Sequence, residues 1–330
     1  MSTMLDPTPA ESVAAPLALD LLGAGDAPLA FAEWSRLESR LADVPLAASR
    51  AWTETWLAHY GDLVPHRFAV GRRNGAASAI ALLSQGVGQS EGPFRVRTVH
   101  LGTAGEPESE SVCVEFNALL SEPDCVGEFL QRLLEHLASE RDWDELRLDG
   151  FALDGAAALF DTAPFLIEER PSHYFDLAAA RSAGETAYQR LGSATRKNLR
   201  KNLNAYGTLQ TEWAETPDQA EAIFADLVRL HQARWTAAGQ PGVYASERFT
   251  RFHQALIARL LPNGKLALFR VRSGGETVGC VQLLIDRNRA LCYQGGCAPY
   301  RGKQSPGLIA DYLCIEECLR RGLAAYDFLA

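Results

Sequence analysis

Small and charged residues gather at positions 300–307 of this 330-residue chain, where the sequence reads YRGKQSPG. An apolar run at 290–294 predicts a buried strand before them, and Pro306 opens a helical pattern that stops at Gly322. The first amides of a helix lack intrahelical acceptors, and the helix dipole adds partial positive charge at that end. The segment therefore predicts a binding site for a pyrophosphate or another anion, with a solvated connecting loop as the alternative.

The window 181–210 is strongly basic, with six Lys and Arg residues against one acidic residue. Arg196 and Arg200 are four positions apart, so they share one face of the helix that the pattern predicts. Lys197 and Lys201 share the adjacent face in the same way. Because the whole chain has a formal net charge of −9, this local reversal indicates a surface for a phosphate-bearing ligand. The alternative is an ordinary solvated helix face.

His231 and Trp235 are four positions apart on a long helix predicted at 217–238. Histidine is the natural proton acceptor near neutral pH, although a His beside a Trp is also a common packed pair. Both interpretations stay open from these residues alone.

Trp52, Trp56 and Tyr60 recur at helical spacing on a helix predicted at 49–60. Such an aromatic stripe indicates a core-facing surface. The alternative is the wall of a ligand pocket.

The composition is that of an ordinary soluble globular protein, with 47% hydrophobic and 22% charged residues. The net charge of −9 disfavours broad nucleic-acid or membrane binding as the main activity. No apolar run approaches the roughly 18 residues that span a bilayer, and the first residues lack the basic start of a signal peptide. Seven Cys residues without paired spacing predict free thiols. Together these features predict a cytoplasmic protein.

The elements that position these residues come in two similar series. In the first half, the patterns predict helices at 31–41 and 49–60, strands at 66–70, 77–84, 96–101 and 112–120, a helix at 123–141 and a strand at 143–148. In the second half they predict helices at 183–206, 217–238 and 246–261, strands at 266–272, 277–286 and 289–294, a helix at 306–321 and a strand at 326–329. The repetition predicts an α/β (α+β) fold of two units, each a mixed, mostly antiparallel sheet flanked by helices.

The second half resembles the GNAT superfamily of N-acyltransferases, in which the loop after the fourth strand holds the pyrophosphate of coenzyme A. Four segments resemble, more narrowly, the bacterial BioF2-like/CelD-type acetyltransferase family: SATRKNLRKNL from Ser193, HQARW from His231, SPG from Ser305 and YDFL from Tyr326. The W-x-x-x-W helix and the order of ESVCVEF and WDELRLDGF fit the same family, so the resemblance covers roughly residues 30–330. Fem-type ligases, which use aminoacyl-tRNA, share this tandem architecture.

The resemblance implies an acyltransferase with acetyl-CoA, or another acyl-CoA, as donor substrate and no metal. The strand before the loop would pair its backbone with the pantetheine arm and supply an N–H to the oxyanion. The donor-binding residues implied are Cys292, Tyr293, Gln294, Arg301, Gly302, Lys303, Gln304, Ser305 and Gly307.

Acyl transfer to an amine also needs proton transfer and a held acceptor. The residues that we expect to serve these roles are His231, Trp235, Tyr244 and Asp311. Arg196, Lys197 and Arg200 are expected to bind the 3′-phosphate of coenzyme A, an anionic sugar acceptor or a tRNA backbone.

We divide the chain into a flexible tail at 1–28 with at most one short strand near 17–21, a degenerate GNAT-like unit at 29–175, and an acyltransferase unit at 176–330. In the first unit the sequence Ser-Glu-Pro-Asp at 121–124 is acidic where a phosphate would lie. That unit is therefore expected to support the second one and to wall the acceptor cleft.

The predicted function is N-acyl transfer from acyl-CoA to an amine of a small-molecule, sugar or envelope-precursor acceptor, by direct attack in a ternary complex. One alternative is an aminoacyl-tRNA-dependent Fem-type transferase, the only case that makes tRNA a partner. Another is a non-catalytic binding or scaffold protein of a polysaccharide pathway. No DNA partner and no membrane span are expected, and the protein is expected to be a monomer or a homodimer.

Overall fold

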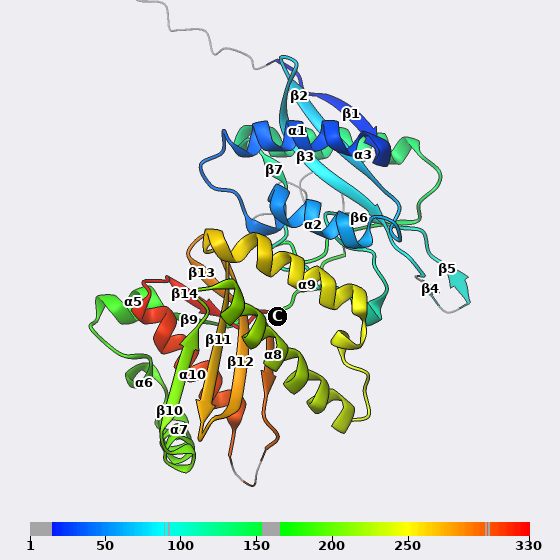
Figure 1. Ribbon diagram of the computed structural model, residues 1–330. Helices are drawn as coiled ribbons and strands as arrows, with labels where there is room; N and C mark the ends of the chain where they lie inside the picture. Colours follow the sequence, from blue (N-terminus) through cyan, green and yellow to red (C-terminus); the bar gives the residue numbers. More distant parts are fainter. Residues whose placement is uncertain (1–14, 89, 92, 154–165, 301, 303) are drawn as a thin grey trace, which may run out of the picture.

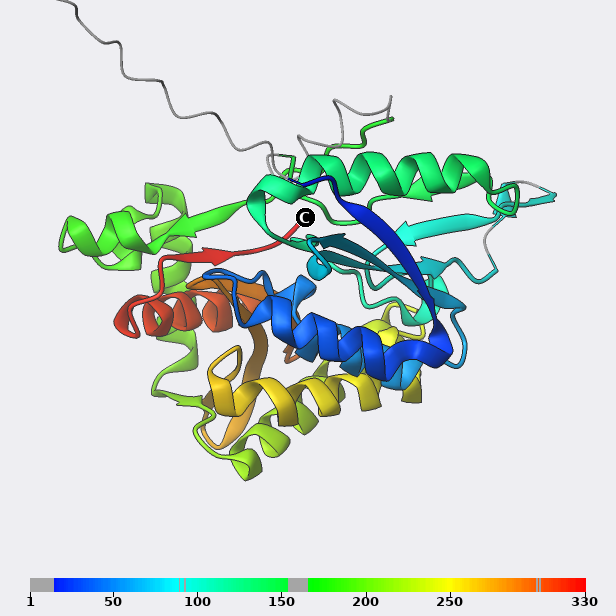
Figure 2. The same cartoon turned by 90° about the horizontal axis from the view of Figure 1, so that it is seen from above.

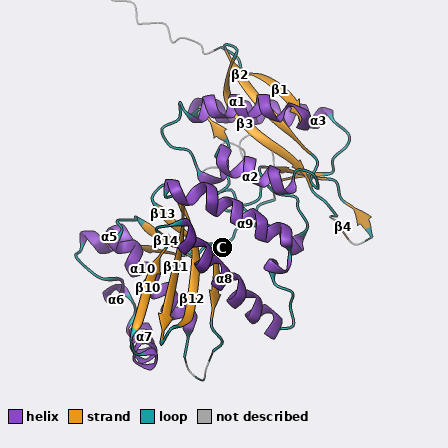
Figure 3. Ribbon diagram, viewed as in Figure 1, coloured by secondary structure: helices purple, strands orange, loops and turns teal. Residues whose placement is uncertain are grey.

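The computed structural model describes residues 15–88, 90–91, 93–153, 166–300, 302 and 304–330. Two α/β units lie one above the other in Figure 1, and each is built on a mixed sheet flanked by helices (Figure 2 and Figure 3). The predicted fold class is confirmed. No helix in the described ranges is long and apolar enough to cross a membrane.

The first unit contains a sheet in the order β1-β2-β3-β6-β8, with β7 paired to β3. All of its pairs are antiparallel except β6 with β8. Its elements are β1 (Ala18–Gly23), η1 (Ala24–Asp26), α1 (Ala27–Glu38), η2 (Leu46–Ala48), α2 (Arg50–Tyr60), β2 (His66–Arg73), β3 (Ala76–Gln85), β4 (Ser90–Glu91), β5 (Phe94–Arg95), β6 (Thr98–Leu101), η3 (Glu108–Glu110), β7 (Leu120–Ser121), η4 (Pro123–Cys125), α3 (Val126–Ser139) and β8 (Glu145–Arg147).

The second unit contains a sheet in the order β10-β11-β12-β13-β14-β9, in which only β13 and β14 are parallel. Its elements are β9 (Tyr174–Asp176), α5 (Leu177–Ser182), α6 (Ala187–Arg190), α7 (Ser193–Tyr206), β10 (Leu209–Trp213), α8 (Pro217–Ala237), η5 (Val243–Ala245), α9 (Glu247–Leu260), η6 (Leu261–Asn263), β11 (Leu266–Ser273), β12 (Glu276–Asp286), β13 (Arg289–Cys297), α10 (Pro306–Arg320) and β14 (Ala325–Asp327).

The two units repeat the same series of elements, as the sequence predicts. A strand, two helices, a hairpin, a third strand, a helix and a parallel strand follow one another in each. The hairpin turns are Asn74-Gly75 and Gly274-Gly275, and all four residues have a positive φ that suits a tight turn. The ladder shifts register between residues 71 and 72 in one hairpin and between 271 and 272 in the other. The repetition therefore extends to the position of a β-bulge.

Capping residues explain where the main helices begin. Ser49 accepts a hydrogen bond from the Trp52 amide at the start of α2, at 3.2 Å. The Thr216 hydroxyl oxygen accepts one from the Gln219 amide at 3.3 Å, and the Thr216 amide donates one to Oε1 of Gln219 at 3.0 Å, which forms a capping box for α8. Pro217 then takes the first helical position, where its missing N–H has no cost.

Two local predictions are wrong. The segment 112–120 is mostly a loop, because Cys113 and Phe116 have φ of 45° and 51° and cannot continue a strand. The single helix predicted at 183–206 is instead a turn at 183–186 that contains Gly184, the short helix α6, and α7, which begins after Gly192. The short strand expected near 17–21 is present as β1, which pairs with β2 from Ala18 to Gly23.

One hydrophobic core joins the two units. It combines Trp52, Trp56 and Phe68 of the first unit with Leu227 and Phe252 of the second. A second core lies under α10 and a third under α3, on the opposite faces of the two sheets. The helices α2 and α9 therefore face each other across the junction, as Figure 1 shows. The aromatic stripe of α2 is core, with Trp56 and Tyr60 fully buried.

Two glycines let helices pack directly on the second sheet. A Cβ at Gly296 of β13 would lie 2.5 Å from the Leu227 carbonyl oxygen of α8. A Cβ at Gly279 of β12 would lie 2.7 Å from the Ala310 Cβ of α10. The helices α8 and α10 thus cover opposite faces of this sheet at glycine contacts.

We expect Gly296→Ala to lower the free energy of unfolding by about 1–3 kcal/mol, because the added methyl group meets the α8 backbone. The neighbouring Gly295→Ala is the control, since a Cβ there meets only ordinary contact at 3.7 Å, and we expect a change within about 0.5 kcal/mol. Urea unfolding followed by circular dichroism measures both. Equal effects would contradict the close packing of α8 on β13.

Candidate functional site

The strand β13 has an interruption in its middle. Gln294 lies opposite Gln282 of β12 and Cys292 lies opposite Leu283, so Tyr293 is the extra residue of a β-bulge. On its other side β13 pairs with β14 only from Arg289 to Leu291. Residues 292–297 extend beyond this pairing, and their outer edge has no partner strand in the part of the chain that the structure describes. An open backbone edge is available to an extended ligand.

The helix α10 begins beside this open edge. Ser305 is its N-cap residue, and the Ser305 amide donates a hydrogen bond of 2.6 Å to Oδ1 of Asn202 in α7. Asn202 is almost fully buried, and its Nδ2 donates to the Asn198 carbonyl oxygen at 3.0 Å, which fixes the orientation of the amide group. Helix α7 is therefore attached to the N-terminus of α10.

Of the remaining residues expected to bind the donor at this loop, three lie within the described part of the chain and two do not. Gly302 has φ of 62°, a left-handed conformation that favours glycine, and Gly307 is the second residue of α10. Gln304 is half-buried just before the helix. Arg301 and Lys303, which the sequence analysis names as charge partners, lie outside the described residues.

The cations of α7 differ in how far they are engaged. Arg196 donates to the carbonyl oxygens of Gln189 and Leu191, at 3.0 and 2.8 Å, and so completes the end of α6. Arg200 donates to the Tyr188 hydroxyl at 3.0 Å. Lys197 and Lys201 are exposed, and Lys201 immediately precedes Asn202, which bonds to the start of α10. These two lysines are the cations of α7 best able to meet a ligand at the loop.

Asp311 lies in α10 beneath the start of the open edge. It is largely buried, which raises its pKa to about 6, while a hydrogen bond of 3.4 Å from the Tyr326 hydroxyl partly offsets the effect. Burial, and then the nearby Asp311 carboxyl, raise the pKa of the Cys292 thiol to about 12. The thiol therefore stays protonated, and Asp311 is the group beside this edge that titrates near neutral pH.

His231, Trp235 and Tyr244 lie together on the opposite face of the sheet. The His231 ring centroid is 5.0 Å from that of Tyr244 and 5.9 Å from that of Trp235. Burial lowers the pKa of His231, whose Nδ1 lies 3.1 Å from Oε1 of Gln232. The Tyr244 hydroxyl is buried without a hydrogen-bond partner among the described residues, and burial raises its pKa.

The structure thus separates the four residues expected to act on the acceptor. Because α8 and α10 cover opposite faces of the sheet, Asp311 lies apart from the cluster of His231, Trp235 and Tyr244. Trp235 is 42% exposed, whereas His231 and Tyr244 are 8% and 6% exposed. A ligand inserted at the open edge of β13 would lie between the two groups.

Sequence reasoning missed Asn202 and the bulge at Tyr293. Asn202 is one of two asparagines in the RKNLRKNL run, and the run itself does not distinguish the one that meets Ser305. The bulge has no sequence signal in a strand that reads RALCYQGGC. Both depend on which segment packs beside them.

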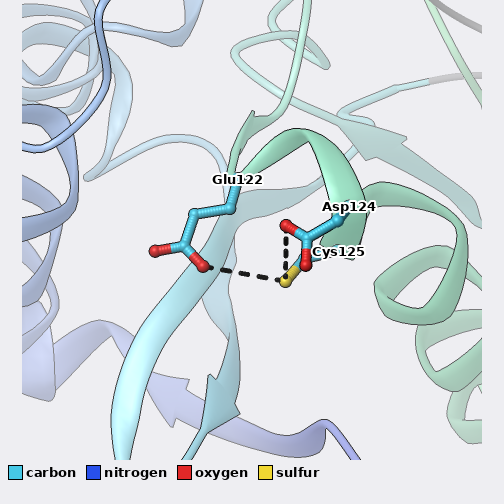
Figure 4. Close-up of side chains that lie close together, drawn as sticks. All are labelled: Glu122, Asp124 and Cys125. Carbon is cyan, nitrogen blue, oxygen red and sulfur yellow. Dashed lines mark hydrogen bonds between the residues drawn. The ribbon is translucent and has the colours of Figure 1, made fainter. Parts of the chain in front are cut away.

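The acidic segment after β7 forms the one group of possible metal ligands that the described residues contain. Figure 4 shows Glu122, Asp124 and Cys125, with the thiol donating to both carboxylates over 3.9 and 3.8 Å. Glu122 also accepts from Arg40 at 3.2 Å and Asp124 from Arg73 at 2.5 Å. Both carboxylates are therefore already paired with cations, at the position where the second unit has its loop.

Residues 193–330 match the model of the family described as an acetyltransferase (GNAT) domain. Among solved structures, FemX is similar over 91% of this chain and 87% of its own, with 12% identity and a TM-score of 0.56. A conserved protein of unknown function from Bacteroides thetaiotaomicron VPI-5482 is similar over 90% of this chain and 87% of its own, with 13% identity and a TM-score of 0.50. A search of curated protein sequences finds no match.

A third similar structure is the C-terminal domain of a putative lysylphosphatidylglycerol synthetase from Agrobacterium fabrum. It has 12% identity and a TM-score of 0.50, and the match covers 92% of this chain and 77% of that one. At such identities the likeness shows the fold alone. Residues 193–330 therefore match an acetyltransferase (GNAT) domain, which supports an acyltransferase, and the likeness of fold extends over both units.

Asp311 provides a test by pH. Because its pKa is raised to about 6 from an ordinary value of 3.8, the folded state binds more protons than the unfolded state between these values, and stability falls as pH rises through them. We expect Asp311→Asn to increase the free energy of unfolding by about 3 kcal/mol above pH 7 and to change it little below pH 4.

Urea unfolding between pH 4 and 8 measures this difference, with Glu221→Gln, an exposed position on α8, as the control. If Asp311→Asn raised the free energy of unfolding equally at every pH, the gain would not come from removing a buried negative charge, and the prediction would be wrong.

Proposed function

We propose that the protein is an N-acyltransferase that moves an acyl group from acyl-CoA, with acetyl-CoA as the leading donor, to an amine. The acceptor classes are those expected from the sequence: a small molecule, a sugar or an envelope precursor. One observation carries the proposal. The open edge at 292–297 and the N-terminus of α10 lie side by side, within the segment that matches the acetyltransferase (GNAT) domain.

The donor fits this edge by its chemistry. The amide groups of a pantetheine arm can hydrogen-bond along 292–297 as an added strand would. The pyrophosphate would then reach residues 301–307, where Arg301 and Lys303 supply positive charge and the helix dipole of α10 favours an anion. Pro306 has no amide hydrogen, and the Ser305 amide already donates to Asn202. The positive charge of Arg301 and Lys303 and the backbone at Gly307 would therefore contribute most of the pyrophosphate binding.

The chemical step is direct attack. The amine nitrogen forms a bond to the thioester carbonyl carbon, the carbon–sulfur bond breaks, and the thiolate of coenzyme A leaves. The proton that the amine loses passes to a base and then to the thiolate. Asp311, with a pKa near 6, is our candidate for that base. An N–H freed at the Tyr293 bulge is our candidate donor to the oxyanion.

The cluster of His231, Trp235 and Tyr244 would position the acceptor from the α8 side of the sheet. The lowered pKa keeps His231 neutral near neutral pH, so it is able to accept a hydrogen bond from an amine. Within the superfamily we assign the chain to the BioF2-like/CelD type on its segments at 193–203, 231–235, 305–307 and 326–329. A cytoplasmic location and a monomeric or homodimeric state complete the proposal.

A second candidate is transfer from aminoacyl-tRNA, as in Fem-type ligases. The exposed Lys197 and Lys201 of α7 favour it, because they offer a cationic surface beside the loop to a polyphosphate backbone. In that case aminoacyl-tRNA binds to the protein and coenzyme A does not.

Calorimetric titration with acetyl-CoA is the first test. We expect saturable binding by the unmodified protein. We expect at least about tenfold weaker binding by Arg301→Ala, because it removes a cation, and by Ser305→Trp, because the added ring fills the loop. Ser182→Trp, exposed at the end of α5, is the control for added bulk. Absence of acetyl-CoA binding would overturn the proposal, and binding without turnover over an amine panel would indicate a binding protein.

A second titration tests the lysines of α7. We expect the double variant Lys197→Ala/Lys201→Ala to bind coenzyme A about threefold to tenfold more weakly but 3′-dephospho-coenzyme A unchanged, because only the former carries the third phosphate. Lys265→Ala, exposed at the start of β11, is the control. An equal loss for both ligands would mean that the lysines act on the pyrophosphate or on the fold.

A further inference from the structure

Two polar side chains lie fully buried behind the bulge of β13. His253 of α9 and Gln282 of β12 are both 0% exposed. Nδ1 of His253 lies 3.0 Å from Nε2 and 3.2 Å from Oε1 of Gln282, so the two side chains are hydrogen-bonded to each other. His253 also packs against Phe224 and Phe249 of the core that joins the two units. Apolar side chains of the same shape would stabilise such a core about as well, so stability alone does not account for this pair.

Both members of the pair are adjacent to the bulge. Gln282 lies opposite Gln294 in the ladder, and the register shift that makes Tyr293 the extra residue comes directly after this pair. The His253 ring is stacked on the Tyr293 ring, with centroids 5.4 Å apart and planes at 23°. The hydrogen bond therefore joins the strand opposite the bulge to the helix that packs on the bulged side chain.

The Tyr293 side chain has two further contacts, and both come from the first unit. Its ring meets the Trp52 ring of α2 at 70°, with centroids 6.2 Å apart, and its hydroxyl donates to the Val112 carbonyl oxygen. Three segments of the chain thus hold this side chain. A bulge locally disrupts the ladder, so the orientation of its backbone depends more strongly on such side-chain contacts.

His253 also connects the bulge to the cluster of His231, Trp235 and Tyr244. Its ring centroid lies 5.7 Å from that of Tyr244, which in turn lies 5.0 Å from that of His231. Tyr244 of the acceptor cluster and Tyr293 of the donor strand therefore pack on the same histidine.

His253 itself is unsuited to proton transfer. Burial lowers its pKa to about 3, which the hydrogen bond with Gln282 offsets in part, so the ring stays uncharged near neutral pH. Its Nε2 is buried and has no hydrogen-bond partner among the described residues. A buried nitrogen without a partner costs free energy. This cost indicates that the bond at Nδ1 serves position rather than stability.

We propose that His253 and Gln282 are positioning residues of the acyltransferase. They fix the bulge at Tyr293 so that its free N–H points to the carbonyl oxygen of the bound thioester. The proposal rests on the proposed function and adds two residues that, being fully buried, touch neither donor nor acceptor. A protein with apolar side chains at both positions is therefore expected to fold but to hold the acyl group poorly.

The double variant His253→Leu/Gln282→Met removes the bond and the stacked ring without leaving an unpaired polar group. Calorimetry compares its binding of acetyl-CoA and of coenzyme A, which differ only in the acetyl group. We expect the unmodified protein to bind acetyl-CoA about threefold to tenfold more tightly, the contribution of one hydrogen bond. We expect the double variant to bind both ligands equally, with its affinity for coenzyme A unchanged.

Two further variants complete the comparison. Leu256→Met, a fully buried change of similar volume on α9, is the control and is expected to keep the preference for acetyl-CoA. Gln282→Met removes only the hydrogen bond and is expected to lower the preference, which gives a second test if the double variant does not fold. Circular dichroism shows which variants are folded.

Carbon-13 NMR of acetyl-CoA labelled at the carbonyl carbon observes the same hydrogen bond directly. A carbonyl carbon resonates further downfield when its oxygen accepts a hydrogen bond. We therefore expect a downfield shift on binding to the unmodified protein and to Leu256→Met, and a smaller shift on binding to the double variant and to Gln282→Met.

The outcomes separate this inference from the proposed function. If neither ligand binds to the unmodified protein, the proposed function fails and the inference fails with it. If the folded variants at His253 and Gln282 keep both the preference for acetyl-CoA and the downfield shift, the inference is overturned and the donor site stands. The same conclusion follows if the unmodified protein binds both ligands equally.

Discussion

The structure depends on one hydrophobic contact, the packing of α2 of the first unit on α9 of the second. Trp52 and Tyr60 pack edge to face against Phe252, and Trp56 stacks on Tyr60. The same core continues beneath both sheets. Ion pairs at its edge, Arg259 with Glu54 and Arg248 with Asp62, are partly exposed and add little beside this burial. Each unit alone would leave its aromatic face in water, so the two units form one body.

This contact also determines what the first unit does for the candidate site. That unit has a carboxylate cluster paired with arginines where the second has its loop, so it offers no second anion site at that position. Instead it brings the loop at 112–116 against Tyr293. Both units therefore have the same order of elements, but the second unit carries the open strand edge, and the first unit packs its loop at 112–116 beside that edge.

The charged side chains of the second unit are also of two kinds, those paired within the unit and those left exposed. Most arginines are matched by carboxylates, as Arg270 is by Glu212 and Asp226. Among the described residues, Lys197, Arg200 and Lys201 of α7 are exposed cations. The carboxyl group of Asp311 has a pKa near 6 because it is buried. A chain of negative net charge can in this way attract a phosphate-bearing ligand at one place.

The sequence by itself determined the elements and their order. Periodicity and Pro306 predicted the repeat, the helix α10 and the loop before it, since these signals are local. Only the tertiary structure decided the site. Val112 and its neighbours read as a strand, but Tyr293 and Glu106 take the backbone groups that a strand would pair. The bulge at Tyr293, the bond from Ser305 to Asn202 and the separation of Asp311 from His231 likewise arise between segments distant in the chain, which no local pattern encodes.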